Sequence, residues 1–253
     1  MDDKKDTKPL AQKPFLDAKP EMETQAPLPP IEEAAELIHK PLNFSVILNA
    51  LLKNPLDLIK TIEERNSLPW KPMMLLCVLS LLIFGLVVGS FSGGLQFWAA
   101  PLKIILGLSF GGLICLPSLY IFSCISGLKA NFQTTIGSLV CAISLLSLLL
   151  VGFAPVIWLF STSSNSVGFF GFLCLTLWII CLNFGFKLIL RAARYLGIQS
   201  ESHLRVWMII FTLVTLQLPT TLRPLIGKSD QLFEFSEKKF FLIHWLDQLT
   251  HGS

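Results

Sequence analysis

The middle of this sequence lacks acidic residues altogether. Between Glu64 and Glu201 there is no Asp and no Glu, although the chain runs there through four long apolar stretches. A soluble domain spreads carboxylates over its surface, whereas lipid excludes them, because a charge at the bilayer centre costs roughly 2.5 to 3.5 kcal/mol. The absence therefore predicts a chain embedded in a bilayer. It also argues against proton or sodium coupling, which commonly depends on carboxylates at mid-membrane.

Charged residues are scarce in the chain as a whole. Only 15% of the 253 residues are charged and 53% are hydrophobic, a composition typical of a polytopic membrane protein. The formal net charge of +3 is too small to indicate binding to nucleic acid. The lysines and arginines are distributed as topology signals rather than as a binding patch.

The cysteines form no metal or redox motif. There is no C-x-x-C pair and no histidine at the spacing of metal ligands. All six cysteines lie within apolar stretches: Cys77, Cys115, Cys124, Cys141, Cys174 and Cys181. Because free cysteine in such surroundings behaves as a small hydrophobic residue, we expect lipid-facing or packing roles, no disulfide framework and no metal or other cofactor.

Catalytic motifs are also missing. The sequence has no G-x-S-x-G, no G-x-x-x-x-G-K and no H-E-x-x-H. Since the carboxylates lie only in the flanking regions, acid-base chemistry within the membrane would depend on Ser, Cys or Lys alone. We therefore expect that the protein is not an enzyme.

Composition divides the chain into four regions. Residues 1–40 mix Lys, Asp, Glu and Pro with few large apolar residues, which predicts a disordered cytoplasmic tail. Residues 41–70 show helical periodicity and are expected to form amphipathic helices. Residues 71–226 form the predicted membrane domain. Residues 227–253 form an external tail with a short amphipathic helix.

Two short helices are predicted before the first long apolar stretch. Asn54 and Pro55 are typical of an N-cap and a first helical residue, and they separate the two helices. The apolar stripes consist of Phe44, Ile47, Leu48 and Leu51 in the first helix and of Leu56, Ile59 and Ile62 in the second. The pair either lies in the cytoplasmic interface, with Trp70 at headgroup depth, or packs as a hairpin on the bundle or on a partner.

The membrane domain is predicted to be an all-α bundle of five transmembrane helices. About 20 apolar residues cross the hydrocarbon layer. The expected spans are Met73–Phe91, Leu102–Ser126, Ile136–Phe160, Val167–Leu190 and Val206–Ile226. The last is the weakest, because Gln217, Pro219 and Arg223 follow its apolar part. Four spans plus an interfacial helix is the alternative.

Basic residues set the expected orientation. Lys60, Arg65 and Lys71 precede the first span, and Lys129 lies between the second and third. The link between the fourth and fifth spans is surrounded by Lys187, Arg191, Arg194 and Arg205. With five spans these regions share one side, which the positive-inside rule makes cytoplasmic, so the C-terminus is external. Lys103 stands alone on the other side beside Trp98 and is expected to extend outward to the interface.

Four residues are candidates for structural or partner and lipid contacts. Asn183 and Gln217, with Ser144 and Ser147, either line a path or join helices through hydrogen bonds. Arg223 follows Pro219, so its side chain would cap freed carbonyls, bind a lipid phosphate or pair with a partner carboxylate.

Glycines and prolines predict how the helices pack. Gly85, Gly89 and Gly93 repeat at spacing four, as do Gly107 and Gly111, which favours close helix packing within the chain or in a homo-oligomer. Pro101, Pro117 and Pro155 are expected to bend or break their helices.

Several proline-containing segments resemble the Yip1 superfamily, particularly its bacterial members. The segments are Ala99-Ala100-Pro101-Leu102-Lys103, Leu116-Pro117-Ser118-Leu119-Tyr120 and Phe153-Ala154-Pro155. The likeness runs from Asn54, in Asn54-Pro55-Leu56-Asp57, to Leu218. It implies a five-helix membrane domain with a cytoplasmic N-terminus, in the bacterial inner membrane. The D-L-Y-G-P-type motif of eukaryotic members is absent, so their interaction with Rab GTPases is not carried over.

Two functions remain open on these grounds. The first is a non-enzymatic multi-pass membrane protein that acts as a scaffold or assembly factor for partner proteins or lipids, through the segment Phe44–Ile62 and the tail Gly227–Leu249. The alternative is a permease or channel component for a small uncharged or anionic solute. A permease needs a polar cavity that reaches mid-membrane, whereas a scaffold needs a packed interior.

Overall fold

The computed structural model describes residues 42–92, 94, 96–128, 131–163 and 166–221. Within these ranges the chain forms seven α-helices and no strand. The helices are α2 (Phe44–Lys53), α3 (Pro55–Arg65), α4 (Trp70–Ser92), α5 (Gln96–Ile125), α6 (Phe132–Ser163), α7 (Val167–Tyr195) and α8 (Ser202–Thr221). The expected tail helix after Gly227, and Arg223, lie outside the described residues.

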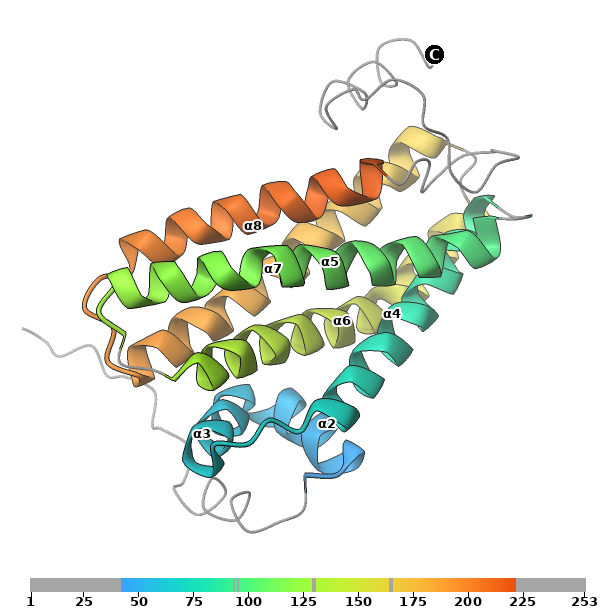
Figure 1. Cartoon of the computed structure of the whole chain (residues 1–253). Coiled ribbons are helices and arrows are strands. Elements are labelled where there is room, and N and C mark those ends of the chain that lie inside the picture. The colour runs from blue at the N-terminus through green and yellow to red at the C-terminus, as the bar shows by residue number, and fades with distance from the viewer. Residues whose placement is uncertain (1–41, 93, 95, 129–130, 164–165, 222–253) are drawn as a thin grey trace, which may run out of the picture.

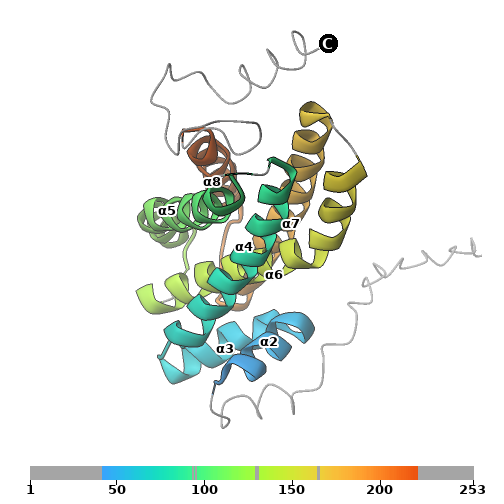
Figure 2. The same cartoon turned by 90° about the vertical axis from the view of Figure 1, so that its right-hand side faces the viewer.

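The five longer helices form a bundle, and the two short ones cover one end of it. α4 packs against α5 and α6, α6 against α7, and α5 against α8. Figures 1 and 2 show α2 and α3 lying across the bundle, beside the start of α4. The links α3–α4, α5–α6 and α7–α8 meet at this same end. There the Gln133 side chain donates a hydrogen bond of 2.8 Å to the Asn66 carbonyl, and the Gln199 amide donates one of 3.0 Å to the Ser126 carbonyl.

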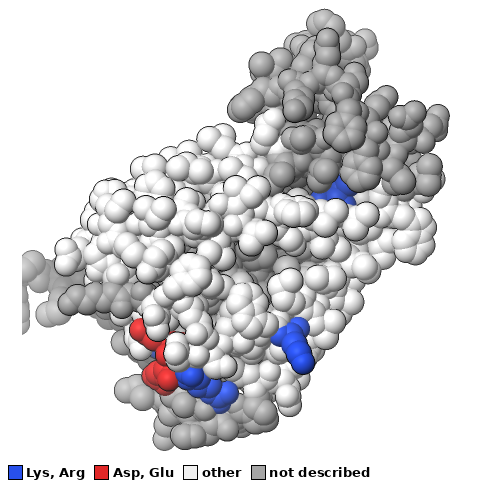
Figure 3. Space-filling model, in the orientation of Figure 1, with Lys and Arg blue, Asp and Glu red and all other residues white. Residues whose placement is uncertain are grey.

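Among the described residues, charge is concentrated at this end of the bundle. The end carries Lys53, Lys60, Arg65, Lys71, Arg191, Arg194 and Arg205 and every acidic residue in the described part of the chain, and it is called the basic end below. Figure 3 shows a broad uncharged surface over the middle of the bundle, with acidic side chains gathered where α3 lies. This surface is the band expected to face lipid.

Among the described residues, four helices are long and apolar enough to cross a membrane. The qualifying segments are Trp70–Phe91, Phe97–Ile125, Phe132–Ser163 and Val167–Tyr195. The apolar part of α8, Ser202–Gln217, is shorter. Length and composition thus define an integral membrane protein with four candidate spans, and α8 lies along α5 as a further apolar helix.

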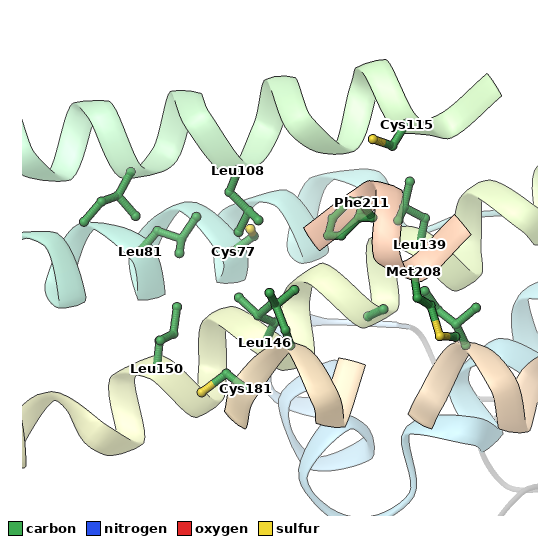
Figure 4. Close-up of a cluster of buried hydrophobic side chains, with 14 of the residues drawn as sticks. Cys77, Leu81, Leu108, Cys115, Leu139, Leu146, Leu150, Cys181, Met208 and Phe211 are labelled. Carbon is green, nitrogen blue, oxygen red and sulfur yellow. The ribbon is translucent and has the colours of Figure 1, made fainter. Parts of the chain in front are cut away.

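The bundle interior is apolar. Buried Leu, Phe, Ile and Cys side chains from α4 to α8 form one cluster, and Figure 4 shows Leu81, Leu108, Leu146 and Leu150 directed into the space between the helices. Cys77, Cys115, Cys141 and Cys181 are buried and unpaired by disulfides, Cys174 is half-buried and Cys124 is exposed. Four cysteines thus pack in the core as expected.

Two local features differ from what the sequence suggested. The prolines break no helix, because α5 continues through Pro101 and Pro117 and α6 continues through Pro155, and the alternative that they bend their helices stays a prediction. Lys103 does not extend outward. It is only 2% exposed and lies on the buried side of α5. A lysine in the first turns of a span was expected to lie at the surface, but its position around the helix axis places it inside.

Candidate functional site

The two short helices form a platform on the basic end of the bundle. Ile47, Leu51, Leu58, Ile59 and Ile62 are buried and pack with residues of α4, α6 and α7. Because their apolar stripes face the bundle, α2 and α3 are fixed to it through hydrophobic contact rather than tethered by one link. The packing on the bundle agrees with one of the two placements that the sequence left open, and the placement in the cytoplasmic interface stays a prediction.

Close contacts fix α3 on its neighbours. A β-carbon added to Gly137 of α6 would lie 2.9 Å from Ile62 Cγ2, so the glycine makes room for the isoleucine. Lys60 Nζ lies 5.3 Å from the centroid of the Tyr195 ring at the end of α7, within the range of a cation–π interaction. The α2–α3 platform therefore touches the ends of two long helices as well as α4.

The first turn of α3 carries a buried carboxylate. Asp57 is 5% exposed, and its carboxylate lies 3.0 Å from Lys60 Nζ. The Thr61 hydroxyl donates a 2.8 Å hydrogen bond to the Asp57 carbonyl. Asp57 also benefits from its place near the helix N-terminus, where negative charge is favoured. This group stabilises α3 and gives no sign of catalytic use.

The outer side of the platform is mostly polar. Ser45, Asn49 and Glu64 are exposed, and Leu52 is an exposed apolar residue among them. Partial burial and the neighbouring Glu64 raise the pKa of the Glu63 carboxyl above its usual range. A polar, helical surface of this kind suits contact with a protein or with lipid headgroups outside the apolar band.

An ion cluster holds the link between α7 and α8. Glu201 accepts a hydrogen bond of 2.6 Å from Arg194 Nε and one of 3.0 Å from Arg205. These bonds lower the pKa of Glu201 to about 2. This cluster was not predicted from the sequence, although the spacing of four between Glu201 and Arg205 is typical of an ion pair on a helix.

Trp207 is a second feature that the sequence analysis missed. The Trp207 side chain extends from α8 and is fully buried against α5. Its Nε1 donates hydrogen bonds of 3.1 Å to the Cys115 carbonyl and to the Ser118 hydroxyl. Phe186 of α7 and Phe211 of α8 pack around the indole. No local pattern identifies these partners, since Ser118 lies 89 residues away in the sequence.

Polar side chains inside the bundle are few and mostly satisfied within their own helix. The Ser147 hydroxyl donates a 2.9 Å hydrogen bond to the Ser144 carbonyl within α6. The Ser144 hydroxyl is buried and has no partner in the described structure.

The structure describes the side chains of two of the four candidate residues. Asn183 is exposed on the outer side of α7, and Gln217 is half-buried on α8. Pro219 lies within α8, close to its end at Thr221, and Arg223 is beyond the described residues. The role proposed for these four residues stays a prediction.

The described part of the chain also contains no group of three or more His, Cys, Asp or Glu side chains arranged to hold a metal ion. The arrangement defines a helical membrane protein with a docked platform at one end. Comparison with protein-family models, curated proteins and solved structures gives no match.

Proposed function

We propose that this protein is a non-enzymatic scaffold or assembly factor, which holds partner proteins or lipids at the cytoplasmic surface through the α2–α3 platform. The observation that carries the proposal is the commitment of both apolar stripes of the platform to the bundle. Because that side is used internally, the opposite, polar side is presented in a fixed orientation. A preorganised surface binds with a smaller entropic cost than a flexible segment does.

The packed interior supports this role over transport. Apolar side chains fill the space between the long helices, and the polar residues that would line a path lie on different sides of the bundle. The buried Ser144 hydroxyl is the specific observation in favour of a permease, because an unpaired polar group at mid-bundle is a possible solute contact. Other buried hydroxyls, such as those of Ser138, Ser147 and Thr215, are hydrogen-bonded within their own helices, so the permease stays the second proposal.

The proposed topology has five spans. α8 runs beside α5 and begins at the basic end, so it is placed to cross in the direction opposite to α5. With the basic end on the cytoplasmic side, the N-terminus is cytoplasmic and the C-terminus external. Five spans in this order agree with the Yip1 resemblance, which in turn suggests the bacterial inner membrane. The external tail is a further proposed contact surface, outside the described residues.

Site-specific photo-crosslinking in the native membrane tests the proposal. A photoreactive amino acid is placed at Asn49 or Glu64, both exposed on the platform, and at Ile114, which is 60% exposed on the lipid-facing side of α5. We expect the platform positions to capture a reproducible protein or lipid in mild conditions, identified by mass spectrometry. Ile114 should capture only bulk lipid.

Transport is measured in the same preparation. Liposomes that contain the purified protein are assayed for leakage of small anionic and uncharged solutes, with Ser144→Leu as the matched variant. Two results together would refute the scaffold and establish the permease. The platform positions would capture nothing beyond what Ile114 captures, and Ser144→Leu would abolish the solute flux.

A further inference from the structure

The outer side of α7 carries polar groups where lipid is expected. Asn183 and Lys187 are both exposed and lie one turn apart on the same side of the helix. Around them are the exposed apolar side chains Phe172, Ile179, Ile180 and Phe184. An amide and an ammonium group within an apolar surface are costly in hydrocarbon unless another group pairs with them.

Both groups lie below the headgroup region. α7 has 29 residues, so it is about 43 Å long at 1.5 Å per residue, which exceeds a hydrocarbon layer of about 30 Å. By the same rise, Asn183 is about 18 Å and Lys187 about 12 Å from the end of α7 at Tyr195. With the excess length shared between both ends, Asn183 falls near mid-membrane and Lys187 falls inside the apolar layer.

The Lys187 side chain does not extend toward the basic end. Its Nζ lies 5.4 Å from the centroid of the Phe184 ring, and Phe184 is nearly one turn further from that end. Side chains on a helix lean toward its N-terminus, which for α7 is the end far from the basic residues. The ammonium group therefore lies along the apolar surface of α7, beside Phe184.

We propose that this surface of α7, formed by Asn183, Phe184 and Lys187, binds a transmembrane helix of another protein that carries a carboxylate at matching depth. One Asp or Glu placed between the two polar groups accepts a hydrogen bond from the Asn183 amide and pairs with the Lys187 ammonium. The flanking Phe172, Ile179 and Ile180 supply apolar contact along the same helix.

A second copy of this chain does not fit the surface. Its membrane region has no Asp or Glu between Glu64 and Glu201, so it offers no counter-charge. If two parallel copies met through α7, the Lys187 side chains of both copies would lie at the same depth, where their like charges repel each other. This inference extends the proposed function to a second surface and rests on it for the existence of protein partners.

Energy transfer between labelled helices in liposomes tests the inference. The full-length protein is placed in phosphatidylcholine vesicles with a labelled polyleucine transmembrane helix that carries one glutamate at the depth of Lys187. Companion helices carry glutamine or only leucine. We expect saturable energy transfer with the glutamate helix alone. The variants Lys187→Met and Asn183→Leu should weaken this binding about five- to thirtyfold, as expected for one polar contact between membrane helices.

Lys71→Met is the matched control, because Lys71 is an exposed lysine at the start of α4. It should leave binding unchanged, and Lys187→Arg should retain most of it. Equal transfer to the leucine helix, or full binding by Lys187→Met, overturns the inference. So does displacement of the glutamate helix by added phosphatidylglycerol, which would assign Lys187 to lipid. Crosslinking from the platform is repeated in the Lys187→Met protein. Platform crosslinks that persist when the glutamate helix does not bind show that this inference has failed and the proposed function has not.

Discussion

Gly85 of α4 lies directly against Pro101 of α5. A β-carbon at position 85 would clash with the Pro101 Cα and would lie 2.6 Å from its Cβ, so any larger residue forces the two helices apart. The ridge of glycines in α4 is thus used within the chain at this position. Pro101, which was expected to bend or break its helix, lies inside a continuous helix and is a packing partner.

Replacing Gly85 with alanine should destabilise the bundle. The added methyl group would meet backbone and a rigid proline ring, and neither can move aside easily. Overpacking of this kind lowers the free energy of unfolding by about 1 to 3 kcal/mol. Thermal unfolding of the purified protein in detergent measures the loss. Gly152→Ala is the control, because a β-carbon on this α6 glycine meets nothing within 4 Å. Equal melting of the two variants would contradict the close contact.

Removing the indole N–H of Trp207 should weaken the attachment of α8 to α5. Trp207→Phe keeps most of the buried ring but loses both hydrogen bonds, which we expect to cost about 1 kcal/mol. Trp158→Phe, on a side chain 56% exposed on α6, should have no comparable effect. Chemical or thermal unfolding in detergent compares them.

A double-mutant cycle isolates the Trp207 contact with Ser118. The Ser118 hydroxyl accepts from the indole and donates to the Cys115 carbonyl, so the two residues share one network. Ser118→Ala should therefore cost less in the Trp207→Phe background than in the wild type. Strict additivity would show that the hydrogen bond contributes nothing.

Periodicity and composition predicted the order of the helices well. The apolar stripes at spacing three and four in Phe44–Ile62 predicted which side of α2 and α3 is buried, since these helices have one polar side. The long helices are apolar all around, so the same signal is missing there. The outward position of Asn183 and the burial of Lys103 both depend on rotation about the helix axis, which such a sequence does not encode locally.

Contacts between residues far apart in the sequence could not be predicted either. Trp207 and Ser118, or Gly85 and Pro101, meet because α5 lies between α4 and α8, and only the assembled bundle brings them together. The Glu201 cluster is different, since one of its two pairs is local. The segment Phe44–Ile62 and Asn183 were both candidates from the sequence, but their positions relative to the bundle could not be predicted from it.

Lys103 should react slowly with amine-directed reagents. Its side chain is covered, whereas that of Lys71 is exposed at the opposite end of the bundle. Brief acylation of the detergent-solubilised protein, followed by peptide mass spectrometry, should modify Lys71 many times faster. Unfolding the protein in denaturant should equalise the two rates, and equal rates without denaturant would contradict the burial of Lys103.

The Glu201 cluster should stabilise the protein at neutral pH and lose that effect in acid. Its pKa in the folded protein is about 2, below the ordinary value of 4.5, so the charged form is favoured by folding. The contribution is complete above pH 4.5 and disappears as pH falls toward 2. The melting temperatures of wild type and Glu201→Gln should therefore differ at pH 7 and converge on acidification.

High salt should also reduce that difference, because the arginine partners are largely exposed and their interaction is screened. Glu64→Gln, at an exposed carboxylate on α3, provides the control for loss of one negative charge. A difference that persists unchanged at low pH would show that Glu201 acts through packing.

Shortening Ile62 should release the platform from the bundle. Ile62 is 1% exposed and fills the space above Gly137, so Ile62→Ala leaves a cavity and is expected to cost about 2 to 5 kcal/mol. Since α2 and α3 contribute little to the contacts among the long helices, the loss should appear as local opening. Limited proteolysis near Asn54 and Asn66 measures it directly.

Leu52→Ala separates docking from helix stability in the same segment. Leu52 is 62% exposed on α2, so its truncation removes a similar side chain without creating a cavity. We expect proteolysis of Ile62→Ala to be fast and that of Leu52→Ala to match the wild type. If the platform holds partners because the bundle fixes its orientation, Ile62→Ala should also lose the crosslinks formed from Asn49. Retention of those crosslinks by an opened platform would show that α2 binds partners without being docked.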